Sequence, residues 1–243
     1  MELRIDGVYI VTGGAGALAD AVATTFGAAG ARLVLVDRVA EELRERAAQH
    51  GAVPHTADLT DAAAAVAMVA DIEGTLGRVD GVIHTAGAFA MERAELSDSA
   101  LYDRMFDVNV RTLVNVTRAA LPGMLARREG FIAGISSHVV WEGTGAASMT
   151  LYAAAKAAVA FYLRSLEREV RPSGVRVAVV YPLAAIDTPG NRREMPDADP
   201  RSWVNPAAIA EALLFAATRG PRGRLTELPI GVAPPPIKAG DRR

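Results

Sequence analysis

The sequence has no cysteine among its 243 residues, and that absence excludes disulfide bonds, thiolate metal sites and cysteine nucleophiles together. Only four histidines are present, and they are scattered without the spacing that a zinc site requires. We therefore expect no metal. The first six residues lack the apolar core of a signal peptide, so the sequence predicts a cytoplasmic protein.

Long apolar runs and a basic excess are also missing. The two most apolar stretches, residues 62–72 and 151–163, are too short to span a bilayer and are interrupted by Asp71 and Lys156. The net charge is -2 and the pI is near 6.1, so no large positive surface is available to collect phosphates. These values argue against nucleic-acid and membrane partners and favour a small-molecule substrate.

The composition that remains, 51% hydrophobic and 22% charged residues, is typical of a single well-packed domain. Short β-rich runs alternate with helical stretches from Val8 onward, which predicts a Rossmann-type, doubly wound parallel sheet of about seven strands with helices on both faces. We assign residues 1–232 to this α/β domain. The proline-rich tail, residues 233–243, is predicted to be a flexible or interface-bound extension. The predicted strands are residues 8–11, 32–36, 53–57, 81–84, 130–136, 175–181 and 225–232. The first predicted helix follows the first strand and ends near residue 29, and the others cover residues 39–49, 62–77, 101–128, 150–170 and 206–218.

A glycine turn follows the first predicted strand. Gly14, Gly16 and Ala19 have the spacing G-x-G-x-x-A between a strand and a helix, as a dinucleotide pyrophosphate at a helix N-terminus requires. Asp37 ends the second strand about 20 residues later, where an acid binds the adenosine ribose hydroxyls and repels a 2'-phosphate. Asp37 therefore favours NAD over NADP, although a guanidinium at Arg38 can also accommodate a phosphate.

Asp58, after the third strand, has two interpretations. Its carboxylate is placed to accept a hydrogen bond from an adenine amino group, or it caps the helix that follows. The sequence leaves both open.

Tyr152 and Lys156 are four positions apart and therefore share one face of the predicted helix 150–170. A cation fixed beside a phenol favours the phenolate, so this pair predicts a tyrosine acid/base whose pKa is brought closer to neutral.

Together these motifs resemble the short-chain dehydrogenase/reductase family in its compact single-domain form. The resemblance covers the glycine turn 12–19, Asp37, the pair Asp58-Leu59, and the turn His84-Thr85-Ala86-Gly87. It continues with Asn109, Ser137, Tyr152 and Lys156, which match the catalytic residues of the family. The resemblance implies cofactor contacts from Thr12, Gly13, Gly14, Gly16, Ala17, Leu18, Asp37, Arg38, Asp58, Leu59, Ala86, Gly87, Tyr152, Lys156, Pro182 and Thr188.

What the resemblance implies is hydride transfer between a secondary alcohol or ketone and a nicotinamide. Tyr152 would exchange the substrate proton and Ser137 would hold the substrate oxygen. Lys156 would lower the tyrosine pKa and hold the nicotinamide ribose, and Asn109 would position a water beside it. Ser136 is a rival for the serine role.

Several positions depart from the family pattern. Ala17 and Ala19 stand where glycines are usual, so we expect their methyl groups to narrow the pyrophosphate cradle. His84 and Thr85 replace paired asparagines, and Leu183 replaces a glycine. These departures support a second hypothesis, a non-catalytic protein of the same fold that senses a dinucleotide or binds a partner. A third hypothesis, an NADPH-dependent ketoreductase, differs from the first only in its cofactor.

A mainly apolar substrate pocket is predicted from His138, Trp141, Met149 and Leu183, which favours substrates with substantial apolar surface. Residues 187–203 are a candidate lid. The helix 150–170 is apolar around much of its circumference, which predicts a homodimer or homotetramer.

Overall fold

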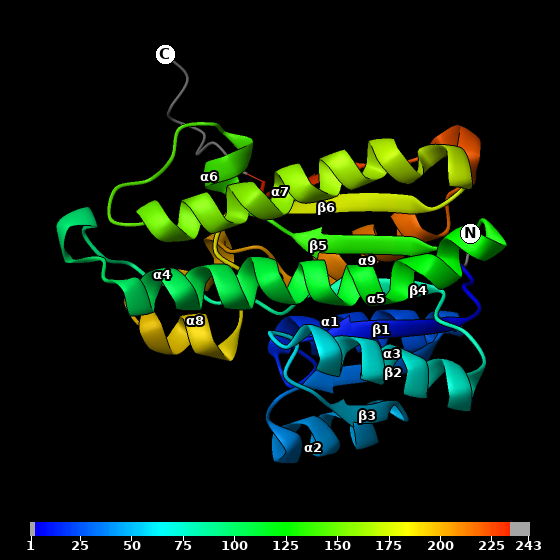
Figure 1. Ribbon diagram of the computed structural model, residues 1–243. Coiled ribbons are helices and arrows are strands. Elements are labelled where there is room, and N and C mark those ends of the chain that lie inside the picture. The colour runs from blue at the N-terminus through cyan, green and yellow to red at the C-terminus, as the bar shows by residue number, and fades with distance from the viewer. Residues whose placement is uncertain (1–2, 234–243) are drawn as a thin grey trace.

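A computed structural model describes residues 3–233. These residues form a parallel sheet with the strand order β3-β2-β1-β4-β5-β6-β7, which confirms the doubly wound Rossmann-type fold (Figure 1). The strands are β1 (Val8–Thr12), β2 (Arg32–Asp37), β3 (Val53–Thr56), β4 (Gly81–His84), β5 (Phe131–Ile135), β6 (Arg176–Pro182) and β7 (Glu227–Ile230). The longer helices are α1 (Ala17–Ala29), α2 (Ala40–His50), α3 (Ala62–Leu76), α4 (Ser99–Phe106), α5 (Thr112–Arg127), α7 (Thr150–Val170) and α9 (Pro206–Ala217).

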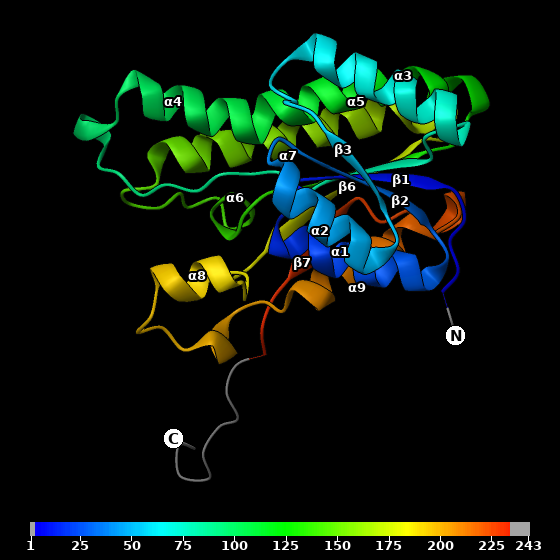
Figure 2. The ribbon, with the colours of Figure 1, turned by 90° about the horizontal axis from the view of Figure 1, so that it is seen from below.

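Helices cover both faces of the sheet. Figure 2 shows α3, α5 and α7 on one face and α1, α2 and α9 on the other. The side chains of β1 alternate accordingly, since Val8 and Ile10 pack in one core while Tyr9 and Val11 pack in the other. Each fully buried valine or isoleucine contributes about 1.5–3 kcal/mol to folding, so this two-sided burial holds the strands in register.

The chain reverses its winding between β1 and β4. Thr12 pairs with Val36 on one side and with His84 on the other, so the carboxyl ends of three strands meet at one edge. In an open α/β sheet a ligand binds at such a point. Most of the candidate residues follow these strand ends.

The helical stretch predicted at 101–128 is confirmed, but it is not a uniform α-helix. The chain forms α4, a π-helical turn (Asp107–Arg111) and α5 without a break between them. A π turn takes one extra residue per hydrogen bond and is frequent at functional sites. This one carries Asn109, which is 1% exposed.

Capping residues fix the ends of several elements. Asp61 is the N-cap of α3, where its carboxylate accepts the Ala63 N–H at 2.8 Å. The cap alternative for Asp58 is therefore wrong.

Two further helices are short, α6 (His138–Trp141) and α8 (Pro189–Glu194). The assignment of residues 1–232 to one domain stays a prediction. The predicted tail falls outside the described residues from 234 onward.

Candidate active site

Three candidate catalytic side chains lie at the carboxyl edge of the sheet. Ser137 follows β5, and its hydroxyl lies close enough to the phenol of Tyr152 on α7 to act on the pKa of that phenol. Lys156, one turn further along α7, places Nζ 5.9 Å from the centre of the Tyr152 ring. The ammonium donates to the Ile135 carbonyl at 3.0 Å, so the end of β5 fixes its position.

The structure separates the two adjacent serines. The Ser136 hydroxyl donates to the backbone carbonyl of Lys156 at 2.9 Å and is thereby turned into the packing between β5 and α7. Ser137 faces Tyr152 instead. Of the two, Ser137 has the geometry to hold a substrate oxygen beside the phenol.

Burial sets the charge states of this cluster. It raises the pKa of Tyr152 above 10, with the Ser137 hydrogen bond acting in the opposite direction. It lowers the pKa of Lys156 to about 8. The expectation that Lys156 brings the tyrosine pKa toward neutral is wrong for this structure, because loss of hydration raises that pKa and the opposing effect comes from Ser137 and not from Lys156.

Asn109 is tied to the segment that follows β4. Its amide donates to the Ala88 carbonyl at 3.0 Å and to the Met105 carbonyl at 2.9 Å, and its oxygen accepts the Ala88 N–H at 3.2 Å. Asn109 therefore binds the π turn to residues 87–88. A Cβ on Gly87 would lie 3.0 Å from the Asn109 oxygen and 3.2 Å from Lys156 Nζ, so a larger residue here would require these two side chains to shift by a few tenths of an ångström.

A groove of about 420 Å³ begins at Gly87 and extends past the ends of β1, β2 and β3. Many of its lining residues are predicted cofactor contacts, namely Gly13, Gly16, Asp37, Arg38, Asp58, Leu59, Ala86 and Gly87. The sequence missed others, Ala15, Val36, Val39, Glu42, Ala57, Thr60, Val108 and Thr112. Thr12, Gly14, Ala17, Leu18, Pro182 and Thr188 lie close in sequence to the site but do not line this groove.

The glycine turn fits a dinucleotide. A Cβ on Gly13 would lie 2.9 Å from the Ala86 backbone, and one on Gly14 would lie 2.9 Å from Leu35 and Leu43. The backbone itself therefore forms the wall of the groove. The N-terminus of α1 has no side-chain cap, so its first N–H groups are available to an anion such as a pyrophosphate.

Ala19 does not obstruct this cradle. Its side chain is fully buried in the core beneath α1, so the expectation that its methyl group narrows the cradle is wrong. The corresponding expectation for Ala17, which is partly buried, stays a prediction.

Asp37 organises the adenosine end of the groove. One carboxylate oxygen accepts the Ala15 N–H at 3.2 Å, and the other accepts the Arg38 N–H at 2.7 Å and the Val39 N–H at 3.3 Å. Asp58 instead accepts from the Thr60 N–H at 2.9 Å and the Thr60 hydroxyl at 2.7 Å, and these bonds lower its pKa. Both carboxylates are thus held in place at the groove.

The predicted substrate residues are dispersed. His138 is nearest to the cluster, with Nδ1 3.5 Å from the Ser137 hydroxyl, and Met149 is the residue before α7. The Trp141 ring packs 5.1 Å from that of Tyr181, and Leu183 packs against Gly231. The candidate lid already contains α8, capped by Thr188, so it is structured rather than an irregular loop.

Phe89 was missed by the sequence analysis. Its ring stands edge-on to the Tyr152 ring, with centres 4.9 Å apart and planes at 79°. The only available signal was its place two residues after the Ala86-Gly87 turn.

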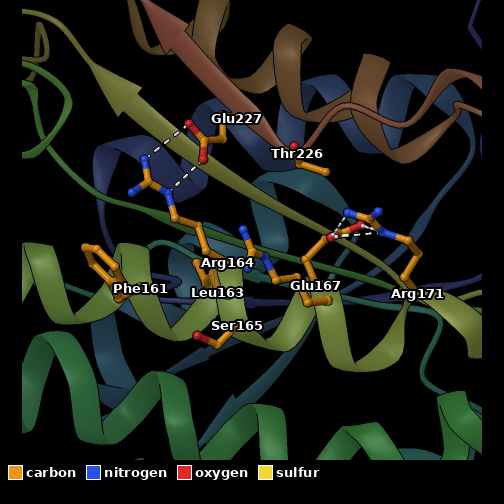
Figure 3. Close-up of a pocket in the computed structure, with 9 residues that line it drawn as sticks. Phe161, Leu163, Arg164, Ser165, Glu167, Arg171, Thr226 and Glu227 are labelled. Atoms are coloured by element: carbon orange, nitrogen blue, oxygen red, sulfur yellow. Dashed lines mark hydrogen bonds and ion pairs between the residues drawn. The ribbon is translucent and has the colours of Figure 1, made fainter.

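A second cavity, of about 460 Å³, lies between the C-terminal half of α7 and β7 (Figure 3). Arg164 forms a two-bond ion pair with Glu227, and Arg171 forms another with Glu167. These pairs involve four of the five charged residues that line the cavity, the fifth being Arg168. The cavity is lined by neither Tyr152 nor a glycine-turn residue.

Within residues 3–233, no group of three or more His, Cys, Asp or Glu side chains is placed to hold a metal ion. No helix in this same range is long and apolar enough to cross a membrane.

Comparison with known proteins agrees with this geometry. The family described as short chain dehydrogenase matches residues 7–199. An uncharacterized oxidoreductase of Staphylococcus aureus is 30% identical over 233 residues, which are 95% of this chain and 99% of the relative. The inactive 2-(S)-hydroxypropyl-CoM dehydrogenase 2 of Xanthobacter autotrophicus is 34% identical over 202 residues, 77% of this chain and 87% of that protein.

Two solved structures are similar at 25% identity. The crystal structure of gox2181 has a TM-score of 0.83 and covers 94% of this chain and 96% of its own. A metagenomic short-chain oxidoreductase in complex with NADP has a TM-score of 0.81, with 94% and 98% covered. The fold and these matches thus define an oxidoreductase. The chain belongs to the short-chain dehydrogenase family, whose members bind a nicotinamide dinucleotide.

Proposed function

We propose that this protein is an NAD-dependent oxidoreductase that transfers a hydride between a secondary alcohol or ketone and nicotinamide, with Tyr152 as the general acid/base. The supporting observation is that the candidate dinucleotide groove and the candidate catalytic side chains adjoin each other. Gly87 lines the dinucleotide groove and also lies against Lys156 and Asn109, so the groove opens directly onto the candidate catalytic side chains.

In the direction of ketone reduction, the substrate oxygen lies between the hydroxyls of Ser137 and Tyr152. Tyr152 gives its phenolic proton to that oxygen, and Ser137 donates a hydrogen bond that stabilises the developing negative charge. A nicotinamide bound in the groove would supply the hydride. Lys156 would hold the nicotinamide ribose, and Asn109 holds Ala88 in place through two hydrogen bonds.

The preference for NAD rests on charge at the adenosine end of the groove. Asp37, Glu42 and Asp58 line it with carboxylates, and Arg38 is the basic residue among them. This excess of negative charge disfavours a 2'-phosphate. The NADP complex of the metagenomic relative makes an NADPH-dependent ketoreductase the alternative to test.

Replacement of Tyr152 by phenylalanine tests the proposed role directly. We expect Tyr152→Phe to lower kcat at least about a hundredfold while the Kd for NADH changes less than about twofold. Tyr102→Phe is the matched control, because Tyr102 is half-exposed on α4 and its ring stacks on Phe106.

A Tyr152→Phe variant that keeps more than about a tenth of wild-type turnover would contradict the acid/base role. Binding of NADH without turnover of any alcohol or ketone by the wild type would instead support the dinucleotide-sensing alternative.

We also propose self-association as a homodimer or homotetramer. Phe161, on the outer side of α7, is 64% exposed, and burial against a second copy would remove that apolar surface from water. Light scattering that shows a stable monomer would contradict this.

A further inference from the structure

The segment that leaves β4 contacts three candidate catalytic residues in succession. Gly87 lies against Lys156, the backbone of Ala88 is hydrogen-bonded at both its N–H and its carbonyl by Asn109, and the Phe89 ring meets Tyr152 edge-on. Each residue of the segment thus has at least one partner in the cluster.

Phe89 keeps much of its surface free. Its side chain is 46% exposed, whereas Phe26 and Phe131 are buried in the core. The Phe89 and Tyr152 rings are in contact, with centres 4.9 Å apart, so the exposed apolar surface of Phe89 belongs to a ring that adjoins the candidate acid/base. A substrate with a phenyl ring next to the reacting carbon binds more tightly when that ring meets a flat apolar partner, because its surface is buried and the two rings pack edge-to-face or offset.

The electrostatics of the catalytic cluster also favour an uncharged substrate. The pKa of Tyr152 responds to burial and to Ser137, and no charged side chain contributes to its shift. Lys156 is turned toward the Ile135 carbonyl. A charged group on the substrate carbon next to the carbonyl would lose hydration in this buried cluster, which disfavours a charged substrate there.

We propose that Phe89 determines substrate specificity, and that the substrate is an uncharged ketone, or the corresponding secondary alcohol, with an aromatic ring next to the reacting carbon. This inference rests on the proposed function. The ring of the substrate packs against the open face of Phe89 while its oxygen lies between Ser137 and Tyr152. Phe89 acts by holding the substrate and takes no part in proton or hydride transfer.

The test compares acetophenone with 2-butanone as substrates at saturating NADH or NADPH. We expect the wild type to prefer acetophenone in kcat/KM. We expect Phe89→Ala to lower kcat/KM for acetophenone by about tenfold to a hundredfold, mainly through KM, and to change that for 2-butanone less than about threefold. Phe89→Tyr keeps the ring and should keep the preference.

Leu96→Ala is the matched control, because Leu96 is also exposed and lies in the same connection between β4 and α4. Thermal unfolding of each variant checks that the fold is intact.

The outcomes separate the two proposals. Turnover of 2-butanone at least as efficient as that of acetophenone, or equal losses for both in Phe89→Ala, overturns the specificity inference and leaves the oxidoreductase assignment standing. Reduction of neither ketone overturns the proposed function, and this inference with it.

Discussion

Substitution of Asp37 by asparagine should weaken the preference for NADH over NADPH. The side chain keeps its size and one acceptor oxygen, and the oxygen that accepts the Arg38 N–H at 2.7 Å is the one best retained. The amide then faces the Ala15 N–H, which lies 3.2 Å from the other carboxylate oxygen. The turn consequently loses one hydrogen bond while the groove loses one negative charge.

The charge effect can be estimated from the position of the carboxylate. Two unit charges 4–5 Å apart at an effective dielectric constant of 20 interact by about 3–4 kcal/mol. Asp37 is only half-buried, so screening by solvent and salt reduces this to about 1–2 kcal/mol for the 2'-phosphate. That difference corresponds to a change of about 5-fold to 30-fold in the ratio of the two dissociation constants.

The ratio of Kd for NADPH to Kd for NADH is the quantity to measure, by nicotinamide fluorescence at fixed ionic strength. Loss of the hydrogen bond to Ala15 acts on both cofactors and cancels in the ratio. Loss of the charge removes the repulsion of the 2'-phosphate and weakens the bonds to the ribose hydroxyls of NADH, and both effects lower the ratio. Glu45→Gln is the control, since Glu45 lies on α2 but does not line the groove. A wild type that binds NADPH as tightly as NADH, or an Asp37→Asn ratio within about twofold of wild type, would refute the reasoning.

Three further predictions follow from burial and close packing. His84 is buried and its pKa is lowered to about 3, so the unfolded chain binds its proton first and stability falls as pH drops below about 6.5. Between pH 7.5 and 5, the free energy of unfolding measured with urea should fall by about 2 kcal/mol in the wild type but not in His84→Asn. Equal losses in the two proteins would contradict the assignment. Because the pKa of Tyr152 is raised, alcohol oxidation should increase with pH up to at least about pH 9 while ketone reduction stays level, and an oxidation plateau near pH 7 would argue against this. Gly87→Ala should lower kcat about tenfold or more without unfolding the protein, because the new Cβ would lie 3.0 Å from Asn109 and 3.2 Å from Lys156. Unchanged single-turnover rates would contradict this crowding of the catalytic side chains.

Local sequence patterns predicted most of the fold. The boundaries of β4 and α7 coincide with the predicted 81–84 and 150–170, because a short buried apolar run and a continuous helical pattern are unambiguous. The sequence also placed Ser137, Tyr152 and Lys156 correctly on a strand end and a helix. A strand end and a helix face are local properties, and the parallel sheet then brings them to the same edge.

Properties that depend on non-local packing were not predictable. The pKa direction of Tyr152 depends on how deeply α7 is buried, and spacing along the helix carries no such information. Phe89 has no periodic pattern around it, and only its contact with Tyr152 reveals its place. The π turn at Asn109 likewise requires one extra residue that helical periodicity does not mark.

The departures at His84 and Thr85 show how a changed motif rebuilds the same wall. His84 is hydrogen-bonded through Nδ1 to the Thr12 hydroxyl at 2.9 Å and through Nε2 to the Thr112 hydroxyl at 3.3 Å. Thr85 donates to the Thr12 carbonyl at 2.6 Å, and the Ala86 N–H donates to the Thr12 hydroxyl at 3.3 Å. Four hydrogen bonds thus join the glycine turn to the end of β4 and to α5. Because they hold the Gly13 and Ala86 backbones in contact, the dinucleotide groove keeps its inner wall without the paired asparagines, and the loss of that motif is no argument against cofactor binding.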